Sequence, residues 1–297
     1  MRLIVLGMLV WSIVCAANAG PLEDADAAYD RKNYAEALKL FRRLADEGNP
    51  SAQYNLGFMF ANGQGVAKDQ KQALSWYKRA AELGNASGQA SLAVMYDEGQ
   101  GIPQDYKQAM IWYQKAAAQG HAGAQNNIGV MYDQGKGVAR DDKQAMYWYK
   151  KAADQGYAPA QASVGVMYDE GQGVPKDYKQ AFFWYQKAAA QGNPAGQNNL
   201  GALYLNGQGV LRDYKIAVSW IEKAAIQGFA PAQLNLGVSY STGQGVARDY
   251  VKAHMWLSLA VKNGQQDAVR HRAVFEKLMT PTQIAEARRL AQEWKSK

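Results

Sequence analysis

The chain has few of the residues that exported proteins use to cross-link themselves or to bind metals. Its 297 residues include one cysteine, Cys15, and three histidines, so no disulfide can form within the chain. No two histidines stand at the spacing of metal ligands, and neither H-E-x-x-H nor C-x-x-C occurs. These absences exclude a disulfide scaffold, and we expect no metal and no cofactor. Stability must come from packing alone.

A long hydrophobic run is also missing. Arg2 is followed by an apolar run of about a dozen residues, well short of the roughly 20 that a membrane-spanning helix needs. Small residues then stand at the −3 and −1 positions before Gly20. This pattern predicts a cleavable export signal over residues 1–19, with cleavage near Ala19-Gly20, and hence a periplasmic or secreted protein. The residue before Cys15 is not small, which argues against lipidation.

The most informative positive feature is a period of 36 residues. Such a period indicates a stack of similar supersecondary units. Tryptophan recurs at Trp76, Trp112, Trp148, Trp184, Trp220 and Trp256, and aspartate at Asp69, Asp105, Asp141, Asp177, Asp213 and Asp249. Glycine recurs at Gly57, Gly129, Gly165, Gly201 and Gly237, with Ala93 in the remaining slot.

Each unit is predicted to be a helical hairpin. In residues 50–85, apolar residues recur at helical spacing on a first helix, and Gly63 and Gly65 then break it. Asp69 is placed to cap a second helix, which carries the tryptophan on its apolar face. One hairpin cannot bury both apolar faces, so the units must stack on one another.

The two ends depart from the unit, as the caps of a solenoid should. Residues 20–49 are predicted to form a shorter capping hairpin without the glycine loop, and residues 50–265 contain six full units. Residues 266–297 are predicted to close the stack with two helices, roughly Asp267–Leu278 and Thr282–Lys295. The sequence Thr280-Pro281-Thr282-Gln283 is a strong helix start. The predicted fold class is therefore all-α, a solenoid of helix-turn-helix repeats.

The unit resembles the Sel-one-like repeat, a relative of the tetratricopeptide repeat. The fourth unit shows the matching residues: Ala160, Gly165, Tyr168, Gly171, Gly173, Val174, Asp177, Ala181, Trp184, Lys187, Ala188, Ala189 and Gly192. The match covers residues 50–265, with a tetratricopeptide-like half at 22–49. The resemblance implies a right-handed superhelix and a role in holding protein complexes together. Exported bacterial members of the family act in envelope signalling, secretion or encounters with host cells.

If the helices pair as in the tetratricopeptide relatives, the first helix of each unit lines a concave groove. The slots on its open face vary most along the chain, and we predict that they bind a partner protein. The candidate residues are Tyr54, Phe58, Asp97, Glu98, Asn126, Asp133, Asp169, Glu170 and Asn198. The acidic members suit a basic or extended peptide segment; the alternative is a solvated face near the helix end. Stacked helices lie about 8–10 Å apart, too far for these aspartates to share a calcium ion.

Positive charge is mild and lies mainly on the second helices. The formal net charge is +7, which favours solubility and does not indicate a nucleic-acid partner. We interpret the basic residues as a solvated convex side, capable at most of weak contact with an anionic membrane surface. They are Lys78, Arg79, Lys115, Lys150, Lys151, Lys187 and Lys223.

Three other motifs have simpler explanations than a functional site. The G-x-G loops recur six times without a following lysine-threonine pair, so they are turns and not phosphate cradles. His254 occupies a slot held by apolar residues in the other units, which predicts a partly buried packing residue. The sequence Ser75-Trp76-Tyr77-Lys78 matches the S-x-x-K motif of penicillin-binding enzymes. However, K-T-G is absent, and three sister units place Ile111, Tyr147 and Phe183 at the position of Ser75.

These observations favour a non-catalytic interaction scaffold of the bacterial envelope, or a secreted one, that binds a partner protein. The alternative is a cell-wall or β-lactam amide hydrolase, or a penicillin-binding activity, at Ser75. Because some cysteine-rich proteins of the resembled family are described as binding or cleaving penicillin, this alternative stays open. A helical-repeat RNA-binding protein is disfavoured by the export signal and by the acidic groove.

Overall fold

The computed structural model describes residues 20–294, and all regular structure within them is α-helical. The chain divides into two compact units, one formed by residues 20–92 with 100–102 and the other by residues 93–99 with 103–294. The predicted export signal and Lys295 lie outside the described residues. The predicted all-α helical repeat solenoid is confirmed.

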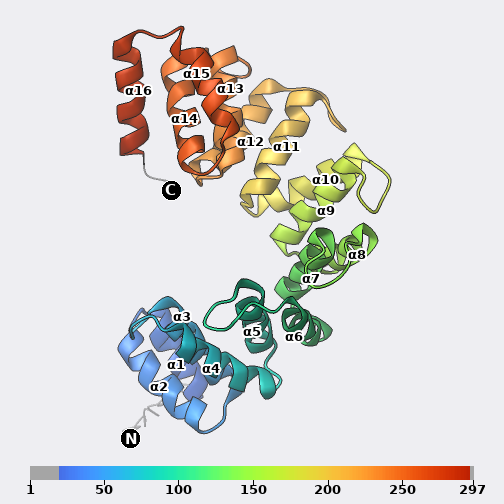
Figure 1. Ribbon diagram of the computed structural model, residues 1–297, viewed down its shortest axis with the longest axis vertical. Helices are drawn as coiled ribbons and strands as arrows, with labels where there is room; N and C mark the ends of the chain where they lie inside the picture. Colours follow the sequence, from blue (N-terminus) through green and yellow to red (C-terminus); the bar gives the residue numbers. More distant parts are fainter. Residues whose placement is uncertain (1–19, 295–297) are drawn as a thin grey trace, which may run out of the picture. The chain divides into compact units, whose positions relative to one another are not determined.

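The first unit consists of helical hairpins that follow one another along the chain (Figure 1). Its helices are α1 (Pro21–Asp30), α2 (Tyr34–Asp46), α3 (Pro50–Asn62) and α4 (Gln70–Glu82). The next helix, α5 (Ala86–Glu98), begins in the first unit and ends in the second.

The second unit continues the same alternation of first and second helices. Its helices are α6 (Tyr106–Ala118), α7 (Ala122–Gln134), α8 (Asp142–Asp154), α9 (Ala158–Glu170), α10 (Tyr178–Ala190), α11 (Pro194–Asn206), α12 (Tyr214–Ile226), α13 (Ala230–Thr242), α14 (Tyr250–Lys262), α15 (Asp267–Glu276) and α16 (Pro281–Glu293). Each helix from α6 to α14 packs against the next, α14 contacts both α15 and α16, and α11 also contacts α9 and α13. The first helices of these neighbouring repeats therefore line one common face.

The repeated aspartate begins the second helix of each repeat, as predicted. The Asp141 carboxylate accepts hydrogen bonds of 3.0 Å from the backbone N–H groups of Lys143 and Gln144 at the start of α8. These N–H groups have no partner inside the helix, so the side chain satisfies them. The equivalent aspartates cap α4, α6, α10, α12 and α14.

The two glycines of the turn between α7 and α8 have different tasks. Gly135 ends α7 in the left-handed conformation, with φ of 67°, where a side chain is strained. Gly137 also has a positive φ, and a Cβ there would lie 2.6 Å from the Cβ of Tyr106 at the start of α6. The second glycine thus allows the turn to pack against the preceding repeat. The structure confirms that this G-x-G segment is a turn.

The repeated glycine of the first helix makes room for a large side chain of the second helix. A Cβ at Gly129 would lie 2.6 Å from the Tyr149 ring, which is almost completely buried. Alanines line the rest of this core, for example Ala145 and Ala152, which are fully buried. Small residues therefore bring the helices close together, and one large side chain fills the space between them.

The last two helices close the second unit. Thr280 forms the predicted capping box with Gln283 at the start of α16. Trp294, at the other end of this helix, packs edge-on against Trp256 with ring centroids 4.7 Å apart. Helix α16 thereby covers an apolar face of α14.

Candidate functional site

The structure joins each predicted groove aspartate to a buried tyrosine of the same repeat. The hydroxyls of Tyr113, Tyr149 and Tyr185 donate hydrogen bonds to Asp97, Asp133 and Asp169, at 3.4, 3.5 and 3.3 Å. All six residues belong to the second unit, and the aspartates are half-buried at the ends of α5, α7 and α9. We call these three pairs the Asp–Tyr ladder.

The tyrosines of the ladder also reach the first helix of the following repeat. The side chains of Asn127, Ser163 and Asn199 hydrogen bond to Tyr113, Tyr149 and Tyr185. Burial is the main cause that raises the pKa of each tyrosine, and the neighbouring carboxylate raises it further. The hydroxyls therefore stay protonated and can donate to the aspartates. The ladder thus links consecutive repeats across this face.

The carboxylates of the ladder accept a hydrogen bond from the tyrosine and keep further acceptor sites. Each carboxylate has about four acceptor sites, and the tyrosine uses one of them. The exposed residues Glu98 and Glu170 follow directly after Asp97 and Asp169. Two basic side chains lie nearby, Arg140, which pairs with Asp142 at 2.8 Å, and Lys176, which lies over the Tyr178 ring. The acidic face is therefore partly balanced yet retains acceptor capacity for a partner.

The two asparagines predicted to bind a partner are more buried than the aspartates. Asn126 and Asn198 are 8% and 6% exposed, and each donates to the next residue, Asn127 or Asn199. Asn198 also accepts a hydrogen bond of 2.9 Å from Asn235, whereas Asn126 Oδ1 has no partner among the described residues. Their small exposed area leaves little surface for direct contact, and their role in partner binding stays a prediction.

Tyr54 and Phe58 lie in the first unit, where they line a cavity of about 400 Å³. Their ring centroids are 6.4 Å apart, and Tyr29 of α1 lies 6.5 Å from Phe58. Phe58 is 38% exposed, so part of this large apolar side chain is open to solvent. The predicted residues thus fall into an aromatic group in the first unit and a polar group in the second.

The basic residues of the second helices are more than the solvated face that the sequence predicted. Lys115 and Lys223 lie over the rings of Trp112 and Trp220, with Nζ 3.9 and 4.0 Å from the centroids. In the first five full repeats a Lys or Arg follows the tryptophan by three residues, which places both on one face of the helix, whereas Leu259 holds this position in the last full repeat. The contact is a cation–π interaction. The W-x-x-K spacing in the sequence is the pattern that could have predicted it.

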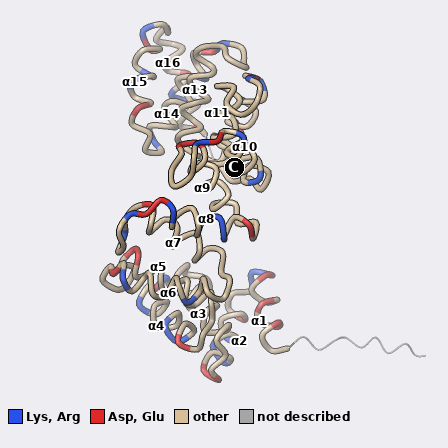
Figure 2. Tube along the Cα trace, turned by 90° about the vertical axis from the view of Figure 1, so that its right-hand side faces the viewer, with Lys and Arg blue, Asp and Glu red and all other residues tan. Residues whose placement is uncertain are grey.

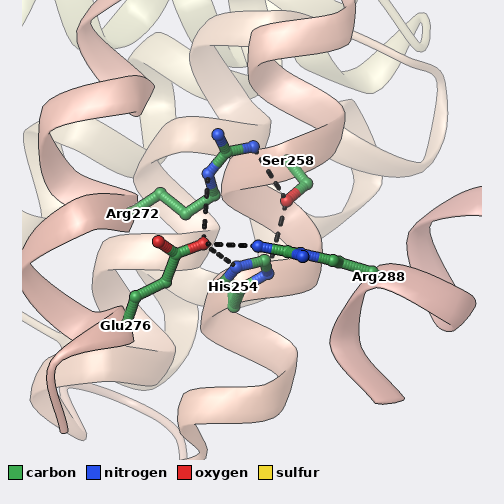
Figure 3. Close-up of polar contacts among 5 residues, drawn as sticks. All are labelled: His254, Ser258, Arg272, Glu276 and Arg288. Atoms are coloured by element: carbon green, nitrogen blue, oxygen red, sulfur yellow. Dashed lines mark hydrogen bonds and ion pairs between the residues drawn. The ribbon is translucent and has the colours of Figure 1, made fainter. Parts of the chain in front are cut away.

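The structure corrects the prediction for His254, which is fully buried and sits in a polar cluster (Figure 3). Its Nε2 lies 2.7 Å from Glu276 Oε1, and its Nδ1 lies 3.3 Å from Ser258 Oγ. Arg272 and Arg288 approach the same carboxylate oxygen at 3.8 and 3.6 Å. The sequence pattern showed only the slot in α14, because the charged members of the cluster come from the atypical helices α15 and α16.

This polar cluster ties the last three helices together. Burial lowers the pKa of His254, so the neutral imidazole donates to Glu276 and accepts from the Ser258 hydroxyl, which also accepts from Arg272 at 3.4 Å. The order hydroxyl, imidazole, carboxylate is that of a hydrolase triad. Because this imidazole has no exposed surface, it cannot pass a proton to a bound substrate. The cluster is a structural tie.

The remaining residues that could have had catalytic or metal-binding chemistry lie on an exposed helix face or at a helix cap. Ser75 and Lys78 are both exposed on α4, and Lys78 pairs with Glu82 at 4.0 Å. His121 caps α7 by accepting a hydrogen bond from Ala124.

Residues 20–294 contain no group of three or more histidine, cysteine or acidic side chains placed to share a metal ion. Within the same range, none of the helices has the length and apolarity to span a membrane.

Comparison with known proteins identifies the repeat. The Sel1 repeat matches residues 28–49, 50–85, 86–121, 122–157, 158–193, 194–229 and 230–265. The crystal structure of a Sel1 repeat protein from Oxalobacter formigenes is 34% identical, with a TM-score of 0.75 over 82% of this chain and 97% of that one. The structure of c5321, a protective antigen present in uropathogenic Escherichia coli strains and displaying an SLR fold, is 29% identical, with a TM-score of 0.50 over 92% and 84%. A comparison with curated proteins found no match. The chain belongs to the Sel1 repeat family.

Proposed function

We propose that this protein is an exported, non-catalytic adaptor that binds a segment of a partner protein on the face lined by its first helices. Sel1 repeat proteins are generally scaffolds for protein–protein interaction and are typically non-catalytic. The Asp–Tyr ladder is the observation that supports this face most directly. It holds three half-buried carboxylates in a row, each with acceptor sites that its tyrosine does not use.

The chemistry of the ladder favours an extended segment with basic side chains or free backbone N–H groups. Carboxylates form their strongest hydrogen bonds with charged donors. A row of acceptors at the repeat spacing suits a chain that runs along the stack, or one face of a helix. The residues that recur in every repeat are occupied by caps, turns and packing. The variable residues of the first helices therefore remain for recognition.

Affinity capture tests this proposal. The tagged protein is used as bait in an envelope extract of its own organism, and captured proteins are identified by mass spectrometry. The test variant combines Asp97→Asn, Asp133→Asn and Asp169→Asn, which removes three charges but leaves an amide oxygen to accept from each tyrosine. The control variant combines Asp154→Asn, Glu222→Gln and Glu293→Gln, three exposed carboxylates on other helices.

We expect the control variant to capture the same partner as the native protein, and the ladder variant to retain about a tenth or less of it, a loss of about 1.4 kcal/mol or more. Equal capture by both variants would remove the ladder from the binding site. Thermal unfolding of both variants shows whether the fold is intact.

The exported location rests on the sequence pattern of residues 1–19, which lie outside the described residues. Cell fractionation followed by N-terminal sequencing of the mature protein tests it, with Gly20 expected as the first residue. No observation favours the hydrolase alternative, since Ser75 is an exposed residue on α4. Turnover of a chromogenic β-lactam that Ser75→Ala abolishes would contradict the adaptor assignment.

A further inference from the structure

The cavity of the first unit has an aromatic interior and an acidic rim. Its volume is about 400 Å³. Helices α1, α2 and α3 contribute its lining: Asp26, Tyr29, Asp30, Phe41, Tyr54, Asn55 and Phe58. Phe41 is buried, whereas the two aspartates and Phe58 are exposed. A side chain entering from solvent would therefore pass between carboxylates and aromatic rings.

The aromatic lining is specific to this part of the chain. Tyr29 lies 5.3 Å from Tyr34, and Tyr54 lies 5.9 Å from Tyr77, measured between ring centroids, so the cavity rings belong to a larger aromatic cluster. The sister positions of Phe58 hold smaller residues: Val94, Val130, Val166, Ala202 and Val238. The repeat therefore does not require a phenylalanine at this position, and the partly exposed ring of Phe58 adds aromatic surface to the cavity.

The two charged residues that line the cavity, Asp26 and Asp30, are both acidic. Helix α1 contains four acidic residues and no basic one, as Figure 2 shows in part. Burial and the neighbouring carboxylates of Asp30 and Glu23 raise the pKa of Asp26. The ion pairs found among residues 20–294 include neither Asp26 nor Asp30, and Asp26 has only a 3.0 Å hydrogen bond from Asn55. A cation would relieve this repulsion.

The position of Asp30 at the end of α1 is electrostatically unfavourable. It is the last residue of α1, where the helix dipole is negative and a carboxylate is unfavourable. Helices α4 and α8 also end in acidic residues, Glu82 and Asp154, but they carry Arg79 and Lys151 in the last turn, whereas α1 has no basic residue there. Asp30 therefore costs α1 some stability, and a ligand that bears positive charge would offset this cost.

We propose that the cavity binds one arginine or lysine side chain of a partner polypeptide. The aliphatic stem would lie against Tyr29, Tyr54 and Phe58, and the cationic end would meet Asp26 and Asp30. Rings with adjacent carboxylates attract cations through the ring quadrupole and through charge. The protein already uses cation–π contacts inside its own repeats, as between Lys223 and Trp220. This inference deepens the proposed function, because it names the side chain that the partner presents to the first unit.

The test uses the whole protein and blocked pentapeptides, acetyl-Gly-Ala-X-Ala-Gly-amide, in which X is arginine, lysine, norleucine or glutamate. Binding is followed by NMR as shifts of the backbone amides of α1 and α3. We expect saturable shifts with arginine and lysine, and none with glutamate. Norleucine has the aliphatic stem without the charge, so it should bind at least tenfold more weakly than lysine.

Three variants test the proposed contacts. Asp30→Asn should weaken the arginine peptide about tenfold while raising the melting temperature slightly, because the unfavourable charge leaves the end of α1. Phe58→Val installs the residue of the sister repeats and should weaken binding by roughly 2- to 30-fold, the range expected for a cation–π contact. Asp24→Asn removes an equal charge from α1 outside the cavity lining and should change binding little.

Besides a failure of the arginine and lysine peptides to bind, two results would overturn the proposal: norleucine binding as tightly as lysine, or Asp24→Asn weakening binding as much as Asp30→Asn. The first would make the cavity merely apolar, and the second would make the effect one of general charge. This test does not depend on partner capture. If the peptides fail to bind while the ladder residues still control capture, only the cavity proposal fails. If the peptides bind and no partner is captured, only the adaptor proposal fails.

Discussion

The middle repeats and the later repeats of the second unit build the same hairpin with different contacts. In residues 122–193, a tyrosine of the second helix fills the space beside the repeated glycine and donates to an aspartate. In residues 194–265, Ile221 and Leu257 fill that space, and Leu205 and Ser241 replace the aspartates. The hydroxyl and its carboxylate are therefore present or absent together in these repeats. The packing needs a large side chain there, and the ladder is an addition to it.

The largest expected effect comes from introducing the tyrosine of an Asp–Tyr pair, without its aspartate, into a later repeat. Ile221 is fully buried and lies against Gly201. Ile221→Tyr would place a hydroxyl beside Leu205, which cannot accept its hydrogen bond, and should lower the free energy of unfolding by about 2 kcal/mol. Chemical denaturation measures this loss.

The complete transfer sharpens the same comparison. Adding Leu205→Asp to Ile221→Tyr should restore about 1 kcal/mol or more, because the acceptor returns. Leu205→Asp alone serves as the control and should be destabilising. If the double variant is no more stable than Ile221→Tyr, the aspartate and the tyrosine are not a coupled pair, and the ladder interpretation is wrong.

The last repeat offers a second comparison, since its slot for an apolar side chain holds His254. Because burial lowers the pKa of His254 in the folded protein, the unfolded chain binds the proton more readily. The stability contributed by the neutral imidazole is then complete above the unfolded pKa of about 6.5 and is lost as the pH falls below it. The Glu276 carboxyl, whose pKa is lowered mainly by its hydrogen bond with His254, adds a loss of the same sign in more acidic solution.

Urea unfolding between pH 8 and pH 5 checks this prediction. The control is His254→Met, which installs the residue that Met110 and Met146 supply in sister repeats. We expect the native protein to lose more stability than this variant between pH 7 and pH 5. Arg272 and Arg288 face the same carboxylate and also disfavour a charged imidazole. If the unfolding free energies of the two proteins depended on pH to the same degree, His254 would not titrate between pH 7 and pH 5.

The sequence predicted the fold well because each recurring residue has a local task. Asp141 caps a helix and Gly135 ends one, and both tasks follow from backbone chemistry and spacing. That Gly129 leaves room for Tyr149 became apparent only in the structure. The contacts of the candidate site were harder to predict. The bond from Tyr149 to Asp133 joins residues 16 apart across two helices, and Glu276, the partner of His254 Nε2, lies in a helix that does not repeat. A period reveals what is common to all units, and it cannot reveal a contact that one unit makes alone.

The smallest expected effect distinguishes Asn126 from Asn198, which occupy equivalent positions in two repeats. Asn198 accepts a hydrogen bond from Asn235 of the following repeat. In the repeat that follows Asn126, the position equivalent to Asn235 is Ser163, which donates to the backbone of its own helix. Asn198→Ala should therefore cost about 1 kcal/mol. Asn126→Ala removes a buried oxygen without a partner and should change the unfolding free energy by less than about 0.5 kcal/mol. Alanine fits this slot in a sister repeat, where Ala162 is buried. Equal losses measured by urea unfolding would mean that Asn126 gains a partner in solution, and the carboxamide would then be a recognition group on the first-helix face.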